Sequence, residues 1–325
     1  MFERLFVRRE SIKDMAVPKR HHYLPRFYLN GFTQDGNLFI YDRNKNEYRS
    51  QTPINTAVEK DFYSIIDDTG KKNTSIESLL ADVETKANKV IDKLNDGNDV
   101  TFQERIDLSL FIALLIGRTP EFDATFKSLQ DNLTRRMGKM LFHSVEQTQK
   151  ILNMHRGTES ESDSTTAKEM YDFVQSDKYD IEFGRVNTLD VMLHLGESLA
   201  KYFCQMNWIV FHTPKGTSFI TTDSPLVVIP PPYSNENSFY RGVGIATPGT
   251  PKFISLTKSC ALAMLDRGQY TLHQNIPQKS VREINLILIW QCYRFVVGRD
   301  EYLLRYLVAK SGIDKREWKP RMAMG

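Results

Sequence analysis

The sequence contains few cysteines, and they show no pairing pattern. Cys204, Cys260 and Cys292 are three among 325 residues, and they lie far apart along the chain. An odd number with no paired ligand spacing excludes a disulfide scaffold and the common zinc-binding motifs. Because unpaired cysteines persist in reducing compartments, we expect a cytoplasmic protein.

Long hydrophobic runs are also absent. The longest, Leu108 to Gly117, is about half the length that a helix needs to cross a bilayer. The first residues, Met1 to Arg9, mix basic and apolar side chains and lead into no secretory apolar core. With a hydrophobic content of 41%, the sequence predicts a globular, soluble chain without membrane contact.

The sequence has little net charge, but its charge is unevenly distributed. Residues 1 to 30 carry a net charge of +4, residues 310 to 325 carry +3, and the total of +3 leaves −4 between them. Basic ends attract phosphate if the fold brings them together, so nucleic acid is one candidate partner. The alternative is that both termini are simply solvated.

A glycine-rich phosphate loop is missing as well. Gly242-Val243-Gly244 lacks both the third glycine and the preceding strand of a dinucleotide-binding fingerprint. The segment around it, Ile229 to Thr250, contains three consecutive prolines and few core residues, which is typical of a long loop and compatible with a lid.

Residues 19 to 32, Lys-Arg-His-His-Tyr-Leu-Pro-Arg-Phe-Tyr-Leu-Asn-Gly-Phe, hold the densest group of chemically capable side chains. Pro25 forces Leu24 to be extended, so His21 to Leu24 is predicted to be strand-like and a short helix should run from Pro25 to Gly31. Side chains alternate along a strand, so His21 and His22 should point to opposite faces. One would then face a cleft while the other is packed, and His22 is the one favoured for chemistry.

The remaining pattern predicts an α+β fold, in which a central helical bundle is joined by small antiparallel sheets from the N-terminal and C-terminal parts. We expect one domain over residues 1–325, with a β-rich opening segment (1–70), a helical segment (71–206) and a mixed segment (207–325). In the opening segment we expect a hairpin at 37–43 and 47–51 and a strand at 61–66. The helical segment should contain helices at 74–94, 101–117, 121–152, from 167 and at 186–205. In the mixed segment we expect a second hairpin at 208–212 and 218–222, strands at 252–256, 260–265 and 294–298, and helices at 277–291 and 301–309.

Two capping boxes support the helical segment, one at Thr74 and Glu77 and one at Thr101 and Glu104. The apolar run from Leu108 to Ile116 should be buried in the centre of the bundle. In the helix at 121–152, a stripe should pack into the core. Its members are Phe122, Phe126, Leu129, Leu133, Met137 and Met140.

Three residue types in the sequence could form a catalytic site. A histidine, His21 or His22, carries protons at neutral pH; Asp223, at a predicted strand end, could orient it; and Arg118, at a helix end, could stabilise phosphate charge. Each also has a structural explanation, because Asp223 can form a turn and Arg118 can satisfy a helix dipole. A histidine and Asp223 could also act as metal ligands, but adjacent histidines on an extended chain diverge and would not readily bind one ion, so chemistry without a metal is preferred.

Other polar residues are candidates for binding. Glu59 precedes a predicted strand beside the histidines, although a lone glutamate is commonly only solvated. Asn285 lies in an apolar helical run, where it would be buried and would need hydrogen-bond partners.

Taken together, several motifs resemble the bacterial family catalogued as domain of unknown function 4238, and the likeness covers nearly the whole chain. The motifs are His21-His22-Tyr23-Leu24-Pro25-Arg26-Phe27-Tyr28-Leu29 with Phe32, Asp61-Phe62-Tyr63, Arg118-Thr119-Pro120, Thr221-Thr222-Asp223-Ser224-Pro225 and Asn285. The chain departs from the family pattern at Thr222, where serine is usual, and at Arg26. The resemblance adds Arg26, Tyr28 and Thr222 to the candidate binding residues.

The family has no established activity, and some members resemble single-gene anti-phage defence proteins. That context raises the expectation of a nuclease that cleaves RNA or DNA, though only by association. Two alternatives stay open. The first is hydrolysis or transfer on a small nucleotide such as NAD. The second is a non-enzymatic sensor that binds a phage component and in which the opening motif is a structural clasp. The sequence identifies no cofactor.

Overall fold

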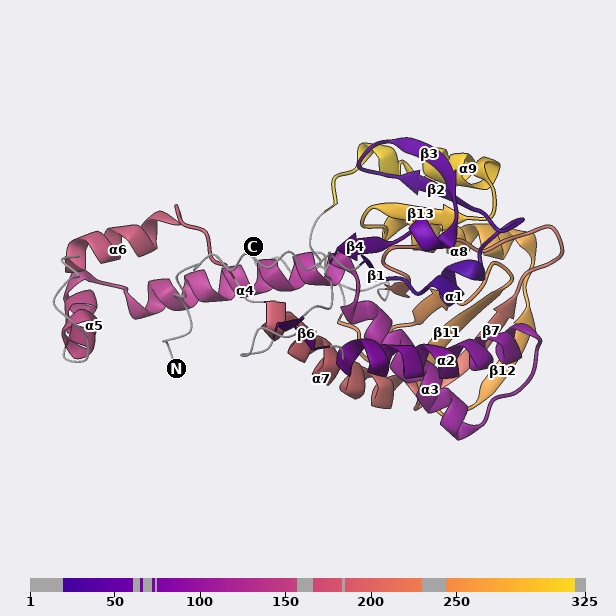
Figure 1. The fold of residues 1–325 in the computed structure, drawn as a ribbon, viewed down its shortest axis with the longest axis horizontal. Coiled ribbons are helices and arrows are strands. Elements are labelled where there is room, and N and C mark those ends of the chain that lie inside the picture. Colours follow the sequence, from indigo (N-terminus) through magenta and orange to yellow (C-terminus); the bar gives the residue numbers. More distant parts are fainter. Residues whose placement is uncertain are drawn as a thin grey trace.

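The computed structural model describes residues 20–60, 65–66, 72–73, 75–156, 166–182, 185–229 and 244–318. A body of sheets and helices carries a helical arm that extends from one side (Figure 1). The strands are β1 (Arg20–His22), β2 (Leu38–Asp42), β3 (Glu47–Gln51), β4 (Val58–Lys60), β5 (Ile65–Ile66), β6 (Lys72–Asn73), β7 (Met206–His212), β8 (Thr221–Thr222), β9 (Leu226–Val228), β10 (Lys252–Ser255), β11 (Cys260–Arg267), β12 (Thr271–Asn275) and β13 (Phe295–Gly298). The α-helices are α1 (Arg26–Asn30), α2 (Ser75–Asn95), α3 (Phe102–Gly117), α4 (Pro120–Leu141), α5 (Val145–Arg156), α6 (Ala167–Ser176), α7 (Arg185–Phe203), α8 (Gln278–Trp290) and α9 (Glu301–Ser311).

A five-stranded sheet in the order β12-β7-β11-β10-β9 separates two hydrophobic clusters. Side chains alternate across β7, so Trp208 and Val210 pack into the first cluster while Ile209 and Phe211 face the second. Helices α2, α3 and α7 supply much of the first cluster, and the segment Tyr23 to Phe32 adds five further side chains to it. Burial of apolar side chains on both faces makes this sheet the centre of the body.

Helices α3 and α7 approach each other closely because glycines lie at their contact. A Cβ atom at Gly117 would lie 2.4 Å from Cγ of Met192, and one at Gly196 would lie 2.6 Å from Cδ2 of Leu114. Both distances are shorter than real Cβ contacts, so the two glycines are required by the packing. The apolar run of α3 is buried in this interface, as the sequence predicts.

The four-stranded sheet combines strands from the N-terminal and the C-terminal parts of the chain. Its order is β3-β2-β13-β8, so the N-terminal hairpin pairs with strands from the C-terminal part. Ile40 of β2 lies opposite Val297 of β13, and Val297 lies opposite Thr221 of β8. Helix α9 covers this sheet with Leu304 and Leu307 (Figure 1). The predicted α+β class is therefore confirmed, with the central helices and sheets built from N- and C-terminal strands.

The predicted second hairpin at 208–212 and 218–222 is wrong. Strand β7 pairs with β11 and, in parallel, with β12, whereas β8 pairs with β13 in the other sheet. The buried amide of Asn285 explains the difference. Its Oδ1 accepts a hydrogen bond from the Ile220 N–H at 3.1 Å, and its Nδ2 donates to the Ser218 carbonyl at 2.9 Å. The side chain satisfies backbone groups that a strand partner would otherwise satisfy.

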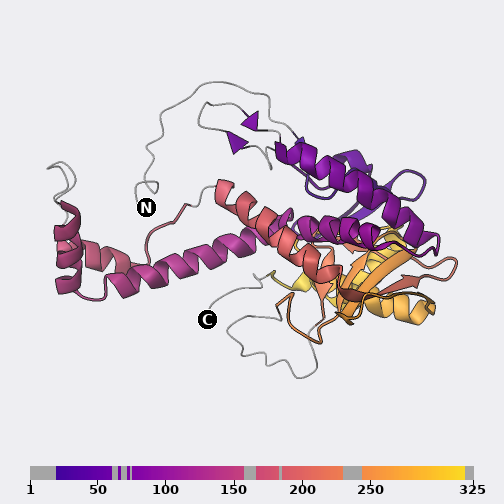
Figure 2. The same cartoon turned by 90° about the horizontal axis from the view of Figure 1, so that it is seen from below.

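The predicted helix over 121–152 is interrupted between α4 and α5. Ser144 accepts a hydrogen bond from the Gln147 N–H at 3.2 Å and so caps a new helix. The outer half of the predicted core stripe is also wrong. Leu133, Met137 and Met140 are 42%, 61% and 75% exposed, because this part of α4 extends beyond the body (Figure 2).

Other predictions fall partly outside the described residues. The predicted strand at 61–66 is described only at Ile65–Ile66, which pairs with Lys72–Asn73 and not with the hairpin. Thr74 of the first capping box and residues 230–243 of the expected lid lie outside the described part. The second capping box, at Thr101 and Glu104, is confirmed. Among the described helices, none is both long enough and apolar enough to span a membrane.

Candidate functional site

The predicted Arg118 and the double histidine lie side by side. Arg118 is the residue that ends α3, and its Nη2 donates to the His22 carbonyl of β1 at 2.9 Å. Its Nη1 donates to Oε1 of Glu84 in α2 at 2.7 Å. The guanidinium is almost fully buried, so these charge-assisted bonds join the opening strand to two helices.

The turn after Arg118 introduces a buried acid that the sequence analysis missed. Thr119 caps α4 by accepting from the Phe122 N–H, and Pro120 begins the helix. Glu121 therefore falls in the first turn, where it is only 6% exposed. Its Oε2 accepts from the Ser224 hydroxyl at 3.2 Å, and its Oε1 accepts from the Thr125 hydroxyl at 3.4 Å. Glu121 thus connects the Arg118 turn to the segment that holds Asp223.

Asp223 itself is fully buried and is held by backbone donors. Its carboxylate accepts N–H bonds from Tyr293 at 3.0 Å, Arg294 at 2.7 Å and Phe295 at 3.0 Å. Burial raises the pKa of this carboxyl from 3.8 to about 7; the three N–H bonds act in the opposite direction, and the charge of Glu121 raises the pKa further. Asp223 therefore titrates near neutrality.

The same charges raise the pKa values of two nearby tyrosines. Burial, followed by the charges of Asp223 and Glu59, raises the pKa of Tyr23 well above its ordinary value of 10.0. The pKa of Tyr293 is also raised, by burial first and then by Asp223 and Glu59. Both phenols consequently stay protonated at neutral pH and can donate hydrogen bonds.

The two histidines differ as the alternation predicts, since His21 is buried and His22 is half-buried. The Nε2 of His22 lies 3.1 Å from the Ile54 carbonyl, which can only accept, so Nε2 carries the proton. This bond fixes the orientation of the ring. His21 lies opposite Glu59 in the pairing of β1 with β4.

Most of the predicted binding residues hold the fold together. The Tyr28 hydroxyl contacts Oγ1 of Thr221 at 2.7 Å and donates to the Ser255 carbonyl at 2.8 Å, so α1 is fastened to both sheets. Thr222 donates to the Ser224 carbonyl and accepts from the Ser224 N–H, which forms the turn after β8. Asn285 binds the segment before β8, as described above. Arg26, in contrast, is exposed on α1.

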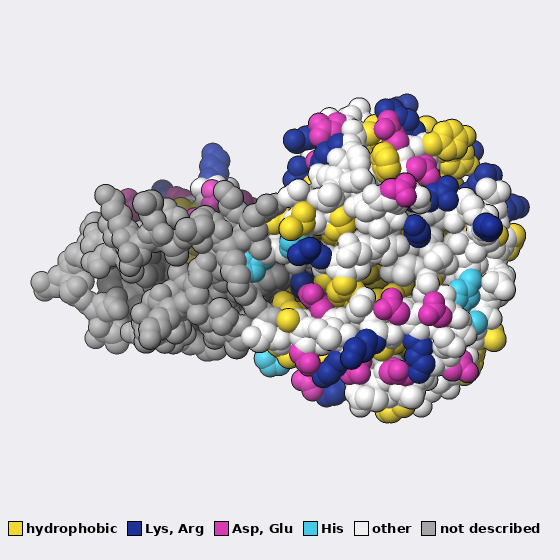
Figure 3. Space-filling view, turned by 45° about the vertical axis from the view of Figure 1, so that its right-hand side comes forward, with side chains coloured by type: hydrophobic (Ala, Val, Ile, Leu, Met, Phe, Trp, Pro, Cys, Tyr) yellow, Lys and Arg dark blue, Asp and Glu magenta, His cyan; other side chains and the backbone are white. Residues whose placement is uncertain are grey.

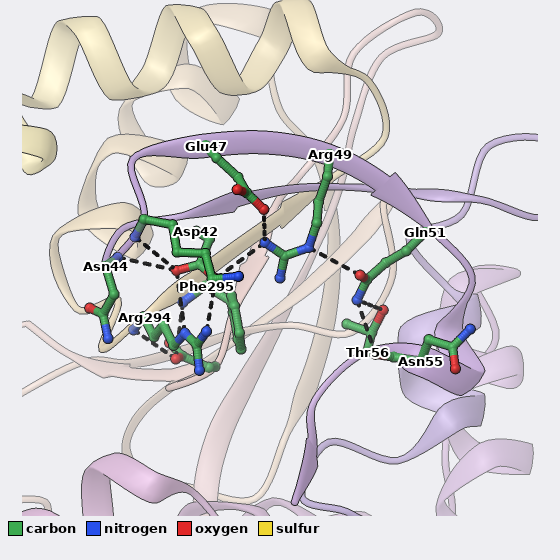
Figure 4. A network of polar contacts seen from close by, with 11 residues as sticks. Asp42, Asn44, Glu47, Arg49, Gln51, Asn55, Thr56, Arg294 and Phe295 are labelled. Atoms are coloured by element: carbon green, nitrogen blue, oxygen red, sulfur yellow. Dashed lines mark hydrogen bonds and ion pairs between the residues drawn. The ribbon is translucent and has the colours of Figure 1, made fainter.

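A second buried aspartate adjoins the site through Arg294. Asp42 is fully buried and accepts from the Arg294 Nη2 at 3.0 Å and from the Arg49 Nη1 at 3.1 Å (Figure 4). Both guanidiniums also lie over the Phe295 ring. Burial alone would raise the pKa of Asp42, but the bonds and charges of the two arginines hold it below its ordinary value. Arg294 thus links this network to Asp223.

The candidate site is therefore formed by segments that are distant in sequence. The segments are His21–Tyr23, Glu59, Arg118–Glu121, Asp223–Ser224 and Tyr293–Phe295. Within the described residues, no group of three or more His, Cys, Asp or Glu side chains is arranged to hold a metal ion. The sequence analysis did not predict Glu121 or Tyr23 as site residues. The only indication of Glu121 in the sequence is its position directly after Arg118-Thr119-Pro120, and that of Tyr23 is its position in the histidine motif.

The comparison with family models agrees with these motifs. A model described as "Protein of unknown function (DUF4238)" matches residues 20–302. The chain belongs to this family. The DUF4238 match includes every residue of the candidate site, from His21 to Phe295. No curated protein and no solved structure matches the chain.

Proton transfer is the chemistry that this DUF4238 site can perform. Two carboxyl groups, Glu121 and Asp223, share one buried region, and the pKa of Asp223 lies near 7. Paired carboxyls in different environments can divide the roles of acid and base between them. The phenols of Tyr23 and Tyr293 are close enough to Asp223 for its charge to raise the pKa of both.

Proposed function

We propose that the chain is a nuclease that hydrolyses phosphodiester bonds in RNA or DNA, and that it acts in defence against phage. The observation that carries the proposal is the buried carboxyl pair of Glu121 and Asp223, in which Asp223 titrates near pH 7. Groups whose pKa is matched to the working pH are typical of acid–base sites. The defence role rests on the family resemblance alone.

The proposed hydrolysis needs one proton acceptor and one proton donor. A carboxylate takes a proton from the attacking water, and a protonated carboxyl returns one to the leaving oxygen. Glu121 is the more accessible member, with 6% exposure against 0% for Asp223. We therefore propose that Glu121 takes the proton from the attacking water, and that Asp223, protonated at the start, gives its proton to the leaving oxygen.

Arg118 and the histidine strand provide the remaining groups. Arg118 lies on the same turn as Glu121, where a cation can offset phosphate charge in the transition state. Its bonds to Glu84 and His22 fix the guanidinium plane. The bond from Nε2 to the Ile54 carbonyl fixes the His22 ring next to the backbone that Arg118 contacts.

The decisive experiment compares the full chain with Glu121→Gln on end-labelled RNA, single-stranded DNA and duplex DNA. We expect wild type to cut one of these, and the variant to be at least about 100-fold slower with little change in thermal stability. Glu104→Gln is the matched control, because Glu104 forms a capping box with Thr101 and an ion pair with Lys93, away from the site. It should lose stability but keep its cleavage rate.

Equal cleavage by wild type and Glu121→Gln would contradict the proposal. The same assay should include NAD and other small nucleotides, analysed by chromatography. Consumption of a nucleotide with intact RNA and DNA would replace the nuclease by a nucleotide hydrolase or transferase.

A non-enzymatic binding protein is the second candidate, and a specific observation favours it. The side chains first expected to be catalytic already make bonds within the fold: Arg118 to Glu84, Asp223 to three backbone N–H groups, and His22 to Ile54. If binding is the function, Glu121→Gln should still protect infected cells. Protection would then be lost only in those variants that lower the melting temperature.

A further inference from the structure

Exposed aromatic side chains lie at the outer face of α8 and α9. Trp290 at the end of α8 is 55% exposed, and Tyr302 and Tyr306 of α9 are 84% and 40% exposed. Exposed rings on two helices that pack against each other are candidates for an interaction site. None of these rings belongs to the carboxyl pair described above.

Arginines accompany these rings. The guanidinium of Arg316 lies 3.7 Å from the Trp290 ring centroid, and that of Arg282 lies 5.9 Å from the Tyr306 centroid. Figure 3 shows basic, acidic and hydrophobic side chains interleaved on the upper part of the body. Stacked arginine keeps N–H groups at the edge of its plane available for phosphate.

The aromatic surface is continuous with the candidate site. The Tyr293 ring packs edge to face against Trp318, with centroids 4.7 Å apart, and the Tyr293 N–H binds Asp223. Arg316 is two residues from Trp318 and covers Trp290. Arg43 connects the same region, since it donates to the Cys292 and Arg316 carbonyls. The Tyr293 and Trp318 rings and the Arg316 guanidinium therefore lie between the segment that holds Asp223 and Trp290.

The charge of this region suits a polyanion. Residues 278–318 contain eight arginines and lysines and five acids. Arg316 stacks on the Trp290 ring, and Arg43 donates to the Cys292 and Arg316 carbonyls. Arg294, in contrast, is paired with Asp42. A peptide partner would be bound by apolar contacts, but this surface alternates cations with flat rings. Such alternation is typical of grooves that bind single strands, where bases stack and phosphates meet cations.

We propose that Tyr293, Trp318, Arg316 and Trp290 form a track that binds single-stranded nucleic acid and leads it to Asp223 and Glu121. A base stacks at Trp290, and the adjacent phosphate binds Arg316. A duplex is not expected, because its bases are already stacked on each other. The direction of the track rests on the proposed function, but the binding of a single strand does not.

The test measures binding separately from cleavage, by fluorescence anisotropy of labelled 12-nucleotide RNA and DNA on the full chain. Trp290→Ala should weaken single-strand binding by about 5- to 100-fold, as expected for the loss of one stacked base. Tyr270→Ala is the matched control, since Tyr270 is 52% exposed but lies before β12, and it should change affinity less than twofold. Arg316→Gln should lower the slope of log affinity against log salt by about 0.7.

Each outcome decides the proposal. Wild type that binds no oligonucleotide at 50 mM salt, or equal weakening by Trp290→Ala and Tyr270→Ala, overturns the track. Tighter binding of a duplex than of either single strand overturns it as well. A chain that binds single strands in a Trp290-dependent way but cuts none of them keeps the track and removes the proposed nuclease. All variants are first compared with wild type by thermal melting.

Discussion

Two buried aspartates show how the nature of the hydrogen-bond donor sets the charge of a carboxyl group. Asp42 and Asp223 are both fully buried. Asp42 receives bonds from two guanidiniums and has a lowered pKa, whereas Asp223 receives three backbone N–H bonds, whose donors are neutral, and has a raised one. A neutral donor does not replace the lost hydration as fully as a counter-ion does. The first aspartate therefore stabilises the fold as an anion, and the second is suited to proton transfer.

Asp42→Asn tests the structural member of this pair. The substitution leaves Arg49 and Arg294 without their shared carboxylate, so we expect a loss of about 2 to 4 kcal/mol in the free energy of unfolding, measured by urea denaturation at pH 7. Glu47→Gln is the control, because Glu47 also contacts Arg49 but is half-exposed, and should cost no more than about 1 kcal/mol. Equal losses in the two variants would show that burial of Asp42 is not decisive.

The raised pKa of Asp223 predicts that the free energy of unfolding falls as the pH rises. For a carboxylate in an ordinary ion pair the sign is the opposite. The folded pKa of Asp223, about 7, exceeds the ordinary 3.8, so the folded state binds the extra proton between these values. The contribution of Asp223 to stability is complete below about pH 4 and is lost as the pH rises through 7. We expect this loss to be on the order of 4 kcal/mol, because each pKa unit corresponds to about 1.4 kcal/mol.

Urea unfolding of wild type and Asp223→Asn at several pH values between 4 and 8 measures this contribution as the difference between the two proteins. In Glu121→Gln the loss should be shifted to lower pH, because the charge that raises the pKa of Asp223 is gone. Parallel pH profiles of wild type and Asp223→Asn would refute the assignment.

The contacts of the candidate residues could be predicted only in part. The resemblance motifs and the residue types predicted His22, Arg118 and Asp223 as candidates, and in the structure Arg118 contacts the His22 backbone while the charge of Glu121 acts on Asp223. Glu121 was missed because an acid in the first turn of a helix has an ordinary explanation in the helix dipole. Only tertiary packing shows that this particular acid is buried.

At the scale of elements, strongly patterned segments were predicted and context-dependent ones were not. The hairpin β2–β3 and helix α3 follow local rules of turn and periodicity. Strand β12 has polar residues on both faces and pairs in parallel with β7, so no alternation identified it. The failed hairpin at 218–222 depended on Asn285, which is more than sixty residues away. Such contacts between distant residues are not visible in a local pattern.

The contact of α3 with α7 gives a prediction for Gly196. Alanine is the better helix former by about 1 kcal/mol, yet its Cβ would lie 2.6 Å from Leu114. We expect overpacking to win, so that Gly196→Ala lowers the free energy of unfolding by about 1 to 2 kcal/mol in urea denaturation. Gly138→Ala in α4 is the control, because its Cβ would make only an ordinary 3.5 Å contact with Val174, and it should be neutral or stabilising. A stable Gly196→Ala variant would mean that α7 can shift without cost.

At the scale of the molecule, the body and the arm differ in how they are stabilised. The body has two apolar clusters on either side of the five-stranded sheet. The arm, formed by the outer part of α4 with α5 and α6, exposes Met137, Met140 and Met154 and contributes few buried side chains (Figure 2). Local stability follows the amount of buried apolar contact, so the arm should open more readily than the body.

Hydrogen exchange measured by mass spectrometry tests this difference. Amides of α5 and α6 should exchange at least about 100-fold faster than those of the apolar second half of α3, where Phe111 to Leu115 are buried. Within one experiment α3 provides the internal reference. Equal protection in arm and body would show that the arm is stabilised by something other than its own contacts.

The pairing of β2 with β13 has a consequence for the synthesis of the chain. Ile40 and Val297, which lie opposite each other, are separated by 257 residues. At a translation rate of about 5 to 20 residues per second, the N-terminal hairpin is made roughly 13 to 50 s before its partner strand leaves the ribosome. During that interval β2 has an unpaired edge and an apolar face, so the nascent chain depends on chaperones or on rapid completion to avoid aggregation.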